Sequence, residues 1–554
     1  MSFVLRKSLP SLTGLVALLL GVGFLAVVFL NAPVWFPIAF ALAIVLLQYA
    51  INPRIIQWLV PAVVVPIENG RFATEHPVGR LLAERCRQAG VPLVKLGIVD
   101  DGTPNAFTFG HTRGDARIWV TRGLLERLDE RELDAVLAHE VGHIKNRDFI
   151  VMTIAAVIPM ILYLVYLTTR SSGRDQAGAV AVVAYVGYLI SQFTLLALSR
   201  SREYAADHWS CTATGDGDAL CSALVKVAYG MGSVDAAKKN ETHAAVQAVK
   251  SRWKRNAKQN QVDMKGLRMQ SMRAMGIFDP RDAVAMETAI AQGVEPERAI
   301  AALRWDMLNP WAKVLEKMSS HPIVANRFKA LENSNLPGKP KRWSVVRSLA
   351  TVSPEQRLAA RARFGKELFI AVAPWAVMIP LVAFGAFRTS TLTIGAAIAG
   401  AGILFLVKQA YRYPGEFEQA QGVTSLLERM DAGPIAGIGV TLTGTIVGRG
   451  MPGYLLSPDL VIQDETGFVP VIYSNPIPLA RSGFGLLRAG RFLGKQATVR
   501  GWYRRSPGPA IDLREIQTTD GLRARGWEWI LRYAVSALVV VIGVAVVLAG
   551  STVN

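Results

Sequence analysis

Long apolar segments limit what this chain can fold into more than any other feature of its 554 residues. Seven segments approach or reach the length of a membrane span, and they cover residues 9–30, 33–50, 149–169, 177–198, 368–387, 392–407 and 529–548. Hydrocarbon offers no partner to a backbone N–H or C=O group, so a segment that crosses a bilayer must satisfy these groups internally, as a helix does. We therefore expect a multi-pass α-helical membrane protein.

Composition and charge agree with this expectation. Hydrophobic residues make up 51% of the chain and its mean hydropathy is +0.29, which is high for a soluble protein. The formal net charge of +19 would also suit a nucleic-acid-binding protein, but the basic residues flank the apolar segments. Arg6, Lys7 and Arg54 then place both ends of the first helix pair in the cytoplasm. The three cysteines show neither metal-site spacing nor a disulfide framework, which fits a reducing compartment.

A short motif indicates metal chemistry. The chain reads H-E-V-G-H from His139 to His143, within a segment that Asp129 and Glu132 mark as a helix through a capping-box spacing. Residues four apart share one face of a helix, so the two imidazoles could bind one metal ion, with Glu140 beside them as a general base. The same pattern also suits two ordinary histidines on a helix. A catalytic zinc needs a third protein ligand, which must come from elsewhere.

Glu203 is the best candidate for that third ligand. It follows the segment 177–198, which returns antiparallel to the segment 149–169, and we expect the histidine helix to run straight into the latter. With a rise of 1.5 Å per residue, His143 lies roughly 9 Å before one span and Glu203 a similar distance beyond the other. Both would then reach the same level at the cytoplasmic surface. Asp207, one turn further, could hold a ligand imidazole through its second nitrogen, or it could be a solvated carboxylate.

Residues 58–148 read as a soluble α/β segment, with strands expected at 94–99, 105–109 and 118–120. The strand 105–109 alternates like an edge strand, which could pair with an extended peptide by β-augmentation. The alternative is that Asn105 is simply a turn residue.

Together these motifs resemble the HtpX and CAAX-prenyl-protease family of membrane zinc metallopeptidases, over about residues 1 to 335. The matching positions are His139-Glu140-x-x-His143 followed by Asp148, Glu203-x-x-x-Asp207, Asn105-Ala106-Phe107, and Ser320-His321-Pro322 followed by Arg327 and Leu331.

The resemblance implies a site and a function. It implies one Zn²⁺ per chain held by His139, His143 and Glu203, with Glu140 as catalytic base and His321 near the active site as a candidate oxyanion stabiliser. On sequence alone, His321 is only a histidine before a proline at a helix start. The supporting residues would be Asp207 and Asp148, and the substrate-binding residues would be Asn105, Ala106, Phe107 and Arg327.

The same resemblance implies polypeptide substrates, in particular misfolded membrane proteins. It also implies a place in the bacterial inner membrane, with the active site facing the cytoplasm. Processing of lipidated peptides is a second enzymatic possibility that the sequence does not separate from general proteolysis.

The region 437–516 changes character to short alternating strands, at 440–446, 460–462, 468–473, 497–502 and 510–513. These strands predict a small OB-like barrel. Such barrels often bind nucleic acid, and residues 502–505, Trp-Tyr-Arg-Arg, offer stacking and charge, so a non-catalytic scaffold with a nucleic-acid-binding barrel is the rival interpretation. We favour a structural or protein-contact barrel and do not expect nucleic acid as a partner.

The predicted fold class is a multi-pass α-helical membrane protein with a mostly helical, zincin-like α+β metalloprotease domain and a small C-terminal all-β, OB-like barrel. The basic segment 238–273 is expected to be a solvated insertion rather than a lid or a lipid-binding segment. The expected domains are an N-terminal hairpin (1–56), the metalloprotease domain (57–335) with a hairpin at 149–198, a linker and third hairpin (336–410), the barrel (411–525) and a last span (526–554).

Overall fold

The computed structural model describes residues 36–551 apart from 69, 73–76, 171–174, 230–302, 389, 451–456 and 507. The expected span at 9–30 and the basic segment 238–273 therefore lie outside the described residues. The chain divides into two compact units. The first unit is Met1–Ile300, Val314–Arg347 and Met451–Leu455, and the second is Ala301–Lys313, Ser348–Gly450 and Leu456–Asn554.

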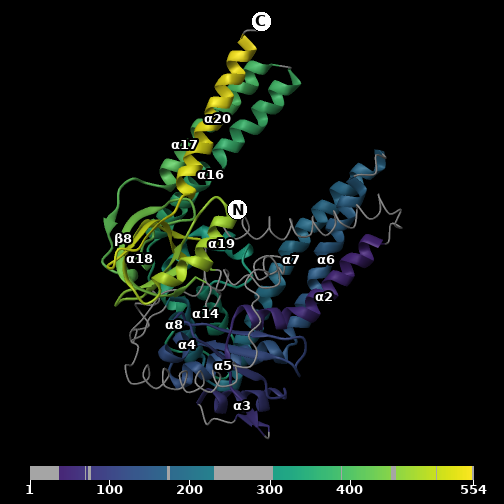
Figure 1. Ribbon diagram of the computed structural model, residues 1–554, viewed down its shortest axis with the longest axis vertical. Helices are drawn as coiled ribbons and strands as arrows, with labels where there is room; N and C mark the ends of the chain where they lie inside the picture. The colour runs from purple at the N-terminus through teal and green to yellow at the C-terminus, as the bar shows by residue number, and fades with distance from the viewer. Residues whose placement is uncertain are drawn as a thin grey trace. The chain divides into compact units, whose positions relative to one another are not determined.

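A mixed four-stranded sheet organises the first unit (Figure 1). Its strands run in the order β1 (Val63–Val64), β4 (Lys95–Val99), β6 (Arg117–Thr121) and β5 (Ala106–Phe109). The pair β4–β6 is parallel and the other two pairs are antiparallel, so β5 is an edge strand of this sheet. The three strands predicted from the sequence are confirmed. A separate two-stranded hairpin is made by β2 (Ile67–Glu68) and β3 (Arg71–Phe72).

Helix α5 (Glu130–Lys145) packs its apolar stripe into the core of this unit. Its start is the expected capping box, in which the Asp129 side chain accepts from the backbone of Glu132 and the Glu132 side chain accepts from the backbone of Asp129. Leu137 and Val141 are fully buried with residues of the sheet. The other helices of the unit are α2 (Phe36–Leu59), α3 (Pro77–Ala89), α4 (Arg122–Arg127), α6 (Asp148–Arg170), α7 (Asp175–Thr214), α8 (Gly217–Tyr229) and α14 (Val324–Glu332).

The expected continuous passage from α5 into the next apolar helix is wrong. Helix α5 ends at Lys145, Asn146 caps it, and Arg147 takes a left-handed conformation with φ of 58°. An L-residue in that conformation cannot continue a right-handed helix, and α6 leaves at a bend of 56°. By contrast, α7 runs unbroken for 40 residues from its apolar part through Glu203, as expected.

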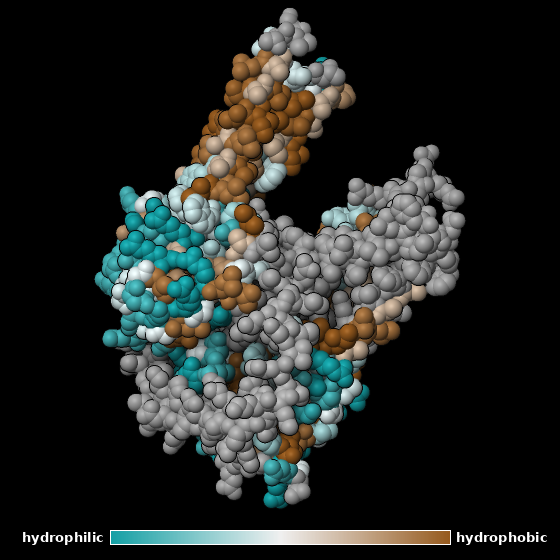
Figure 2. Space-filling view, in the orientation of Figure 1, coloured by the Kyte–Doolittle hydropathy of each residue, from teal (hydrophilic) through white to brown (hydrophobic). Residues whose placement is uncertain are grey.

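Three long helices of the second unit form a bundle: α16 (Pro354–Phe387), α17 (Thr391–Arg412) and α20 (Glu528–Ser551). Their outer surfaces are strongly hydrophobic, as the brown atoms of the bundle show in Figure 2. Among the described residues, four helices are long and apolar enough to cross a membrane, namely these three and Ala179–Thr214. A fifth would be the bent pair of α5 and α6.

The C-terminal strands of the second unit close into a five-stranded barrel. Its ring is β8 (Ile438–Arg449), β9 (Leu460–Gln463), β10 (Phe468–Ile472), β12 (Pro509–Thr518) and β11 (Gln496–Arg505), and a parallel pairing of β10 with β12 completes it. All five predicted strands are confirmed within this ring. The smaller elements of the unit are α12 (Arg304–Leu308), β7 (Glu418–Gln419), α18 (Val423–Leu427), α19 (Pro478–Leu487), a 3₁₀ turn (Ala489–Phe492) and β13 (Arg523–Arg525). Two short helices, α13 (Pro310–Lys317) and α15 (Val345–Ala350), lie at the boundaries of the units.

The aromatic and basic residues that we considered for stacking on nucleic acid are buried inside the second unit. The Trp502 indole donates to the Pro414 carbonyl at 2.9 Å, and Arg504 pairs with Asp512 at 2.7 Å. The Arg505 side chain is fully buried and pairs with an aspartate of α12. The surface role suggested for residues 502–505 is therefore wrong, because these side chains connect the barrel to the segments packed around it.

Close backbone contact between α17 and α20 requires glycine. A Cβ added to Gly543 would lie 2.2 Å from the Ala399 backbone nitrogen, whereas one added to Gly400 would meet nothing within 4 Å. Replacing Gly543 with Ala should destabilise the purified protein by about 1–3 kcal/mol through overpacking. The Gly400→Ala variant carries the same gain in helix propensity without the clash, so its thermal midpoint should stay equal to or above that of the wild type. Equal midpoints for the two variants would contradict this packing.

Candidate metal centre

The candidate metal centre lies where α5 and α7 cross at close range. A Cβ added to Gly142 would lie 3.2 Å from the Ala206 Cα and 3.1 Å from Trp209, so the helices approach too closely for a larger residue to fit without movement. The Ser210 hydroxyl of α7 also donates to the Ala135 carbonyl of α5 at 2.6 Å. The crossing thus fixes the histidines of one helix against the carboxylates of the other.

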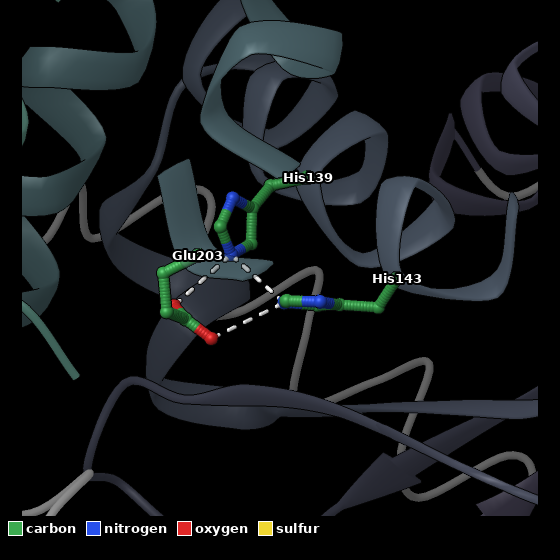
Figure 3. A group of neighbouring side chains, drawn as sticks. All are labelled: His139, His143 and Glu203. Atoms are coloured by element: carbon green, nitrogen blue, oxygen red, sulfur yellow. Dashed lines mark hydrogen bonds and ion pairs between the residues drawn. The ribbon is translucent and has the colours of Figure 1, made fainter. Parts of the chain in front are cut away.

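Three ligand-type side chains converge at this crossing (Figure 3). The Nε2 atoms of His139 and His143 lie 3.2 Å apart. One carboxylate oxygen of Glu203 is 3.6 Å from His139 Nε2, and the other is 3.5 Å from His143 Nε2. His139 and Glu203 are buried and His143 is slightly exposed.

These separations fit a shared zinc ion. Ligand atoms about 2.0–2.1 Å from a tetrahedral zinc lie about 3.3–3.4 Å from one another. Two imidazole nitrogens and one carboxylate are also a donor set that leaves one position of a four-coordinate zinc for water. The three residues can therefore hold a metal ion without a large rearrangement.

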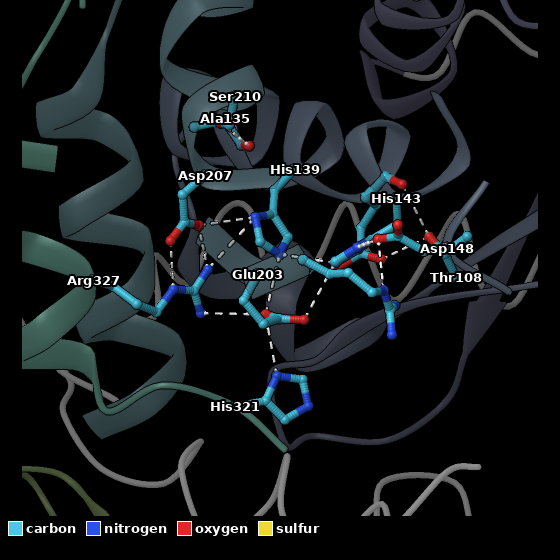
Figure 4. A network of polar contacts seen from close by, with 12 residues as sticks. Thr108, Ala135, His139, His143, Asp148, Glu203, Asp207, Ser210, His321 and Arg327 are labelled. Carbon is cyan, nitrogen blue, oxygen red and sulfur yellow. Dashed lines mark hydrogen bonds and ion pairs between the residues drawn. The ribbon is translucent and has the colours of Figure 1, made fainter. Parts of the chain in front are cut away.

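The second ring nitrogen of each histidine is held by a carboxylate (Figure 4). His139 Nδ1 lies 3.0 Å from Asp207, and His143 Nδ1 lies 2.6 Å from Asp148. A proton held on Nδ1 leaves each Nε2 lone pair aimed at the metal position. The break after α5 makes the second contact possible, because it turns the first residue of α6 back toward His143.

Two arginines, Arg327, which is buried, and Arg202, which is half-buried, balance these carboxylates. Arg327 of α14 donates to Asp207 at 2.8 Å and lies 3.9 Å from Glu203, while Arg202 lies 3.1 Å from Asp148. Burial lowers the pKa of the Arg327 guanidinium, but Asp207 and Glu203 outweigh burial and the pKa is raised overall. Arg327 therefore remains a cation beside the site.

Glu140 is bound to the edge strand, and His321 is bound to a residue of the centre. The Thr108 hydroxyl of the edge strand β5 donates to the Glu140 carboxylate at 2.6 Å. His321 Nδ1 lies 3.1 Å from Glu203, and the segment before it is tied to α7, because Arg200 donates to the carbonyls of Glu316 and Ser319 at 2.9 and 2.8 Å. A residue far along the chain is thus brought to the same centre.

The predicted substrate-strand residues lie in and next to β5. The backbone of Asn105 bonds Thr121, with its N–H donating to the threonine hydroxyl at 2.8 Å. Ala106 is half-buried, whereas the Phe107 ring packs edge-on against Trp119 in the core. Any contact of Phe107 with a peptide would therefore be made by its backbone.

Sequence reasoning did not assign roles to several residues that shape the centre: Thr108, Gly142, Arg200 and Arg202. The alternation of the edge strand could have indicated Thr108, since it lies on the same face as Ala106. The others carried no local signal, because their roles exist only where α5, α7 and the His321 segment meet.

Fold and site together define a membrane-associated chain with a metallopeptidase-type centre. The model of peptidase family M48 matches residues 73–335. The protease HtpX homolog of Methanothermobacter thermautotrophicus is 41% identical over 197 residues, which are 34% of this chain and 73% of that protein. The protease HtpX homolog of Pyrococcus abyssi is 35% identical over 228 residues, 38% of this chain and 75% of that protein. The chain belongs to peptidase family M48 and is a membrane metalloprotease.

A solved structure shows a weaker likeness. The crystal structure of Ste24p from S. mikatae shares 21% identity, covers 39% of this chain and 55% of that chain, and has a TM-score of 0.29. At that score, the structural likeness carries no argument about this chain.

The Asp148 carboxylate, which lies 2.6 Å from His143 Nδ1, should affect the affinity of the centre for zinc. Replacing Asp148 with Asn removes the charge that orients this imidazole, and the zinc dissociation constant should rise about 10- to 100-fold. Competition with a chromophoric chelator measures this constant. The control is Asp134→Asn on α5, the helix that carries His143. The Asp134 carboxylate pairs with Arg85 instead, so the zinc affinity of this variant should equal that of the wild type. Equal affinities for both variants would contradict the role of Asp148.

Proposed function

We propose that this protein is a zinc-dependent endopeptidase that hydrolyses peptide bonds at the cytoplasmic surface of a bacterial inner membrane. The observation that carries the proposal is the convergence of His139, His143 and Glu203, beside Glu140, at the ends of apolar helices. A centre at that level suits substrates that emerge from the bilayer. Removal of misfolded membrane proteins is the role that we propose for it.

His139, His143 and Glu203 would hold the zinc ion. When bound, zinc lowers the pKa of a coordinated water and polarises a carbonyl group. Glu140 follows His139 directly in the sequence, and the hydrogen bond from Thr108 restricts the orientation of its carboxylate, so we propose that it is the general base. Glu140 would take a proton from water and deliver it to the leaving amine.

His321 and Arg327 both lie close to Glu203, and we propose a supporting role in the reaction for each. His321 is partly exposed beside the centre, which suits a donor to the oxyanion that develops on the substrate. The Arg327 guanidinium is bound to Asp207, so we propose that it positions His139 through that carboxylate rather than binding substrate directly as first expected.

The substrate would extend along β5 as an added strand. In the sheet that the structure describes, β5 pairs with β6 on one side only, and Thr108 connects the strand to the catalytic carboxylate. Main-chain hydrogen bonds would supply affinity with little dependence on side chains, as in other cases of β-augmentation. Such recognition suits varied polypeptides. We also propose that Asn105, next to the first residue of the strand, binds the substrate.

We also propose that the first unit has a zincin-like fold and that the barrel has an OB-like fold. A mixed sheet with an edge strand beside the H-E-x-x-H helix supports the zincin-like interpretation. The barrel ring order, with α19 between its third and fourth strands and a parallel closure, supports the OB-like interpretation. The domain limits given above stay predictions.

Two other functions stay under consideration. Processing of lipidated peptides would use the same centre, and only the choice of substrate separates it from general proteolysis. A non-catalytic scaffold that binds nucleic acid has lost its main support, because residues 502–505 are buried.

Removal of the proposed base should abolish cleavage and leave the metal in place. For Glu140→Gln we expect kcat to fall about 10²- to 10⁴-fold, because the proton acceptor is lost. Zinc content per chain should match that of the wild type, since no ligand changes. Casein cleavage and elemental analysis measure the two quantities.

The matched control is Glu130→Gln, an exposed position at the start of the same helix. It should keep full activity. Wild-type cleavage by Glu140→Gln, with Glu130→Gln equally active, would remove the proposed mechanism.

Peptide substrates should test the role of β5. A peptide whose backbone N–H groups are methylated at alternate positions near the scissile bond cannot donate to an added strand. We expect its KM to rise about 2- to 12-fold per lost hydrogen bond, given about 0.5–1.5 kcal/mol for each bond. Methylation at the remaining positions is the control. Equal KM values for both methylation patterns and for the unmodified peptide would contradict strand addition.

A further inference from the structure

Helix α19, on the flank of the barrel, has one face that the barrel buries and one that it leaves exposed. On the inner side, the Phe484 ring stacks on Tyr473 with ring centroids 3.9 Å apart, and Arg449 donates to the Gly485 carbonyl at 2.7 Å. On the outer side, Leu487 is 72% exposed and Leu486 is 44% exposed, while Ile477 just before the helix is 61% exposed. Hydrophobic surface over α19 is visible in Figure 2.

Basic residues border this apolar face. Arg488 and Arg491 follow the helix and are exposed, as are Arg523 and Arg525 of β13. Arg488 donates to the Arg523 carbonyl at 3.2 Å, which brings the two pairs of arginines together. No Asp or Glu occurs from residue 466 to residue 511. Arg525 also lies 3.7 Å from Glu515, so the net positive charge of this surface comes mainly from Arg488, Arg491 and Arg523, and it is complementary to an anionic partner.

The exposed face also adjoins the point where the chain enters a candidate membrane span. The Ser474 carbonyl, three residues before Ile477, accepts the backbone N–H of Trp527 at 2.9 Å. Trp527 is 50% exposed and directly precedes α20. Three residues span at most about 10 Å, and the hydrogen bond and the step from Trp527 to α20 add several more, so Ile477 lies within about 20 Å of the start of the span. Tryptophan at such a position is typical of a membrane–water interface.

We propose that α19 is an interfacial helix that binds the bilayer surface. Ile477, Leu486 and Leu487 insert among the lipid headgroups, and the neighbouring arginines bind the phosphates of anionic phospholipids. Short helices with an apolar face and a basic border lie in the interface in this way, with that face 5–10 Å deep. The barrel is then held against the membrane by α19 as well as by α17 and α20. This inference does not depend on the metal centre or on its proposed activity.

The proposal can be tested on the full-length protein in lipid nanodiscs with a nitroxide spin label at Leu487→Cys. The native cysteines are buried, and burial raises the pKa of the Cys86 thiol to about 11, so labelling will favour the added residue. The label position is compared with Gln517→Cys, an exposed site on β12 of the same barrel. Collision with oxygen reports lipid, and collision with a water-soluble nickel complex reports water.

In nanodiscs that contain phosphatidylglycerol, the label at position 487 should be accessible to oxygen and shielded from nickel, and the label at 517 should show the reverse. Reversal of charge in R488E/R491E removes this attraction and adds a repulsion, so it should weaken insertion by at least about fivefold per arginine in anionic discs and have little effect in phosphatidylcholine. A label at 487 that collides freely with nickel in both lipids would overturn the proposal. So would a label shielded from both reagents, because a protein surface, such as a second copy of the chain, would then cover α19.

Discussion

The close crossing of α5 and α7 is the constraint on which the metal centre depends. His139 and His143 lie on one helix and Glu203 and Asp207 on the other, so the separations between the histidines and the carboxylates depend on the distance between the helix axes. Gly142 and Ala206 allow that distance, because an added Cβ on the glycine would already press on the facing backbone. A change at Gly142 would thus move both histidine-to-Glu203 distances at once, without altering any ligand.

Buried charge adds a second constraint on the same centre. Asp207, Asp148 and Glu203 are all buried, and each lies beside an arginine or a histidine in the network of Figure 4. Removing charges from water costs free energy that their mutual attraction offsets only in part, so such a network is a poor way to stabilise a fold. Its value is that it holds two imidazoles in one orientation with their Nε2 atoms together.

In the second unit, buried polar contacts attach the small barrel to its neighbouring helices. Glu367 of α16 accepts backbone N–H groups of Ile435 and Ala436 at 3.1 and 3.3 Å, and the buried pair of Arg505 and Asp306 ties α12 to the barrel. Arg504 and Arg505 of β11 therefore serve internal connections. The exposed arginines Arg488, Arg491, Arg523 and Arg525 instead border α19.

Sequence patterns predicted many helices and strands because these elements depend on interactions between residues that are close in the sequence. Apolar length predicted four of the helices that could cross a membrane, alternation predicted the strands of the sheet and barrel, and the Asp129 and Glu132 spacing predicted the start of α5. The pairing of histidines four apart on one helix is equally local. These features need no knowledge of which segments meet.

The predictions that failed concern what lies next to a segment in space. Nothing local distinguishes the buried residues Trp502 and Arg505 from exposed ones, because their burial depends on α12 and on the chain around Pro414. Nor does sequence predict the left-handed conformation of Arg147, which bends the chain and turns Asp148 toward His143.

The sequence by itself thus determined the helices, the strands and the chemical types of the candidate ligands. Only the tertiary structure decided that Glu203, His321 and Arg327 share one centre, since residues more than 100 positions apart are brought within hydrogen-bond distance by packing alone.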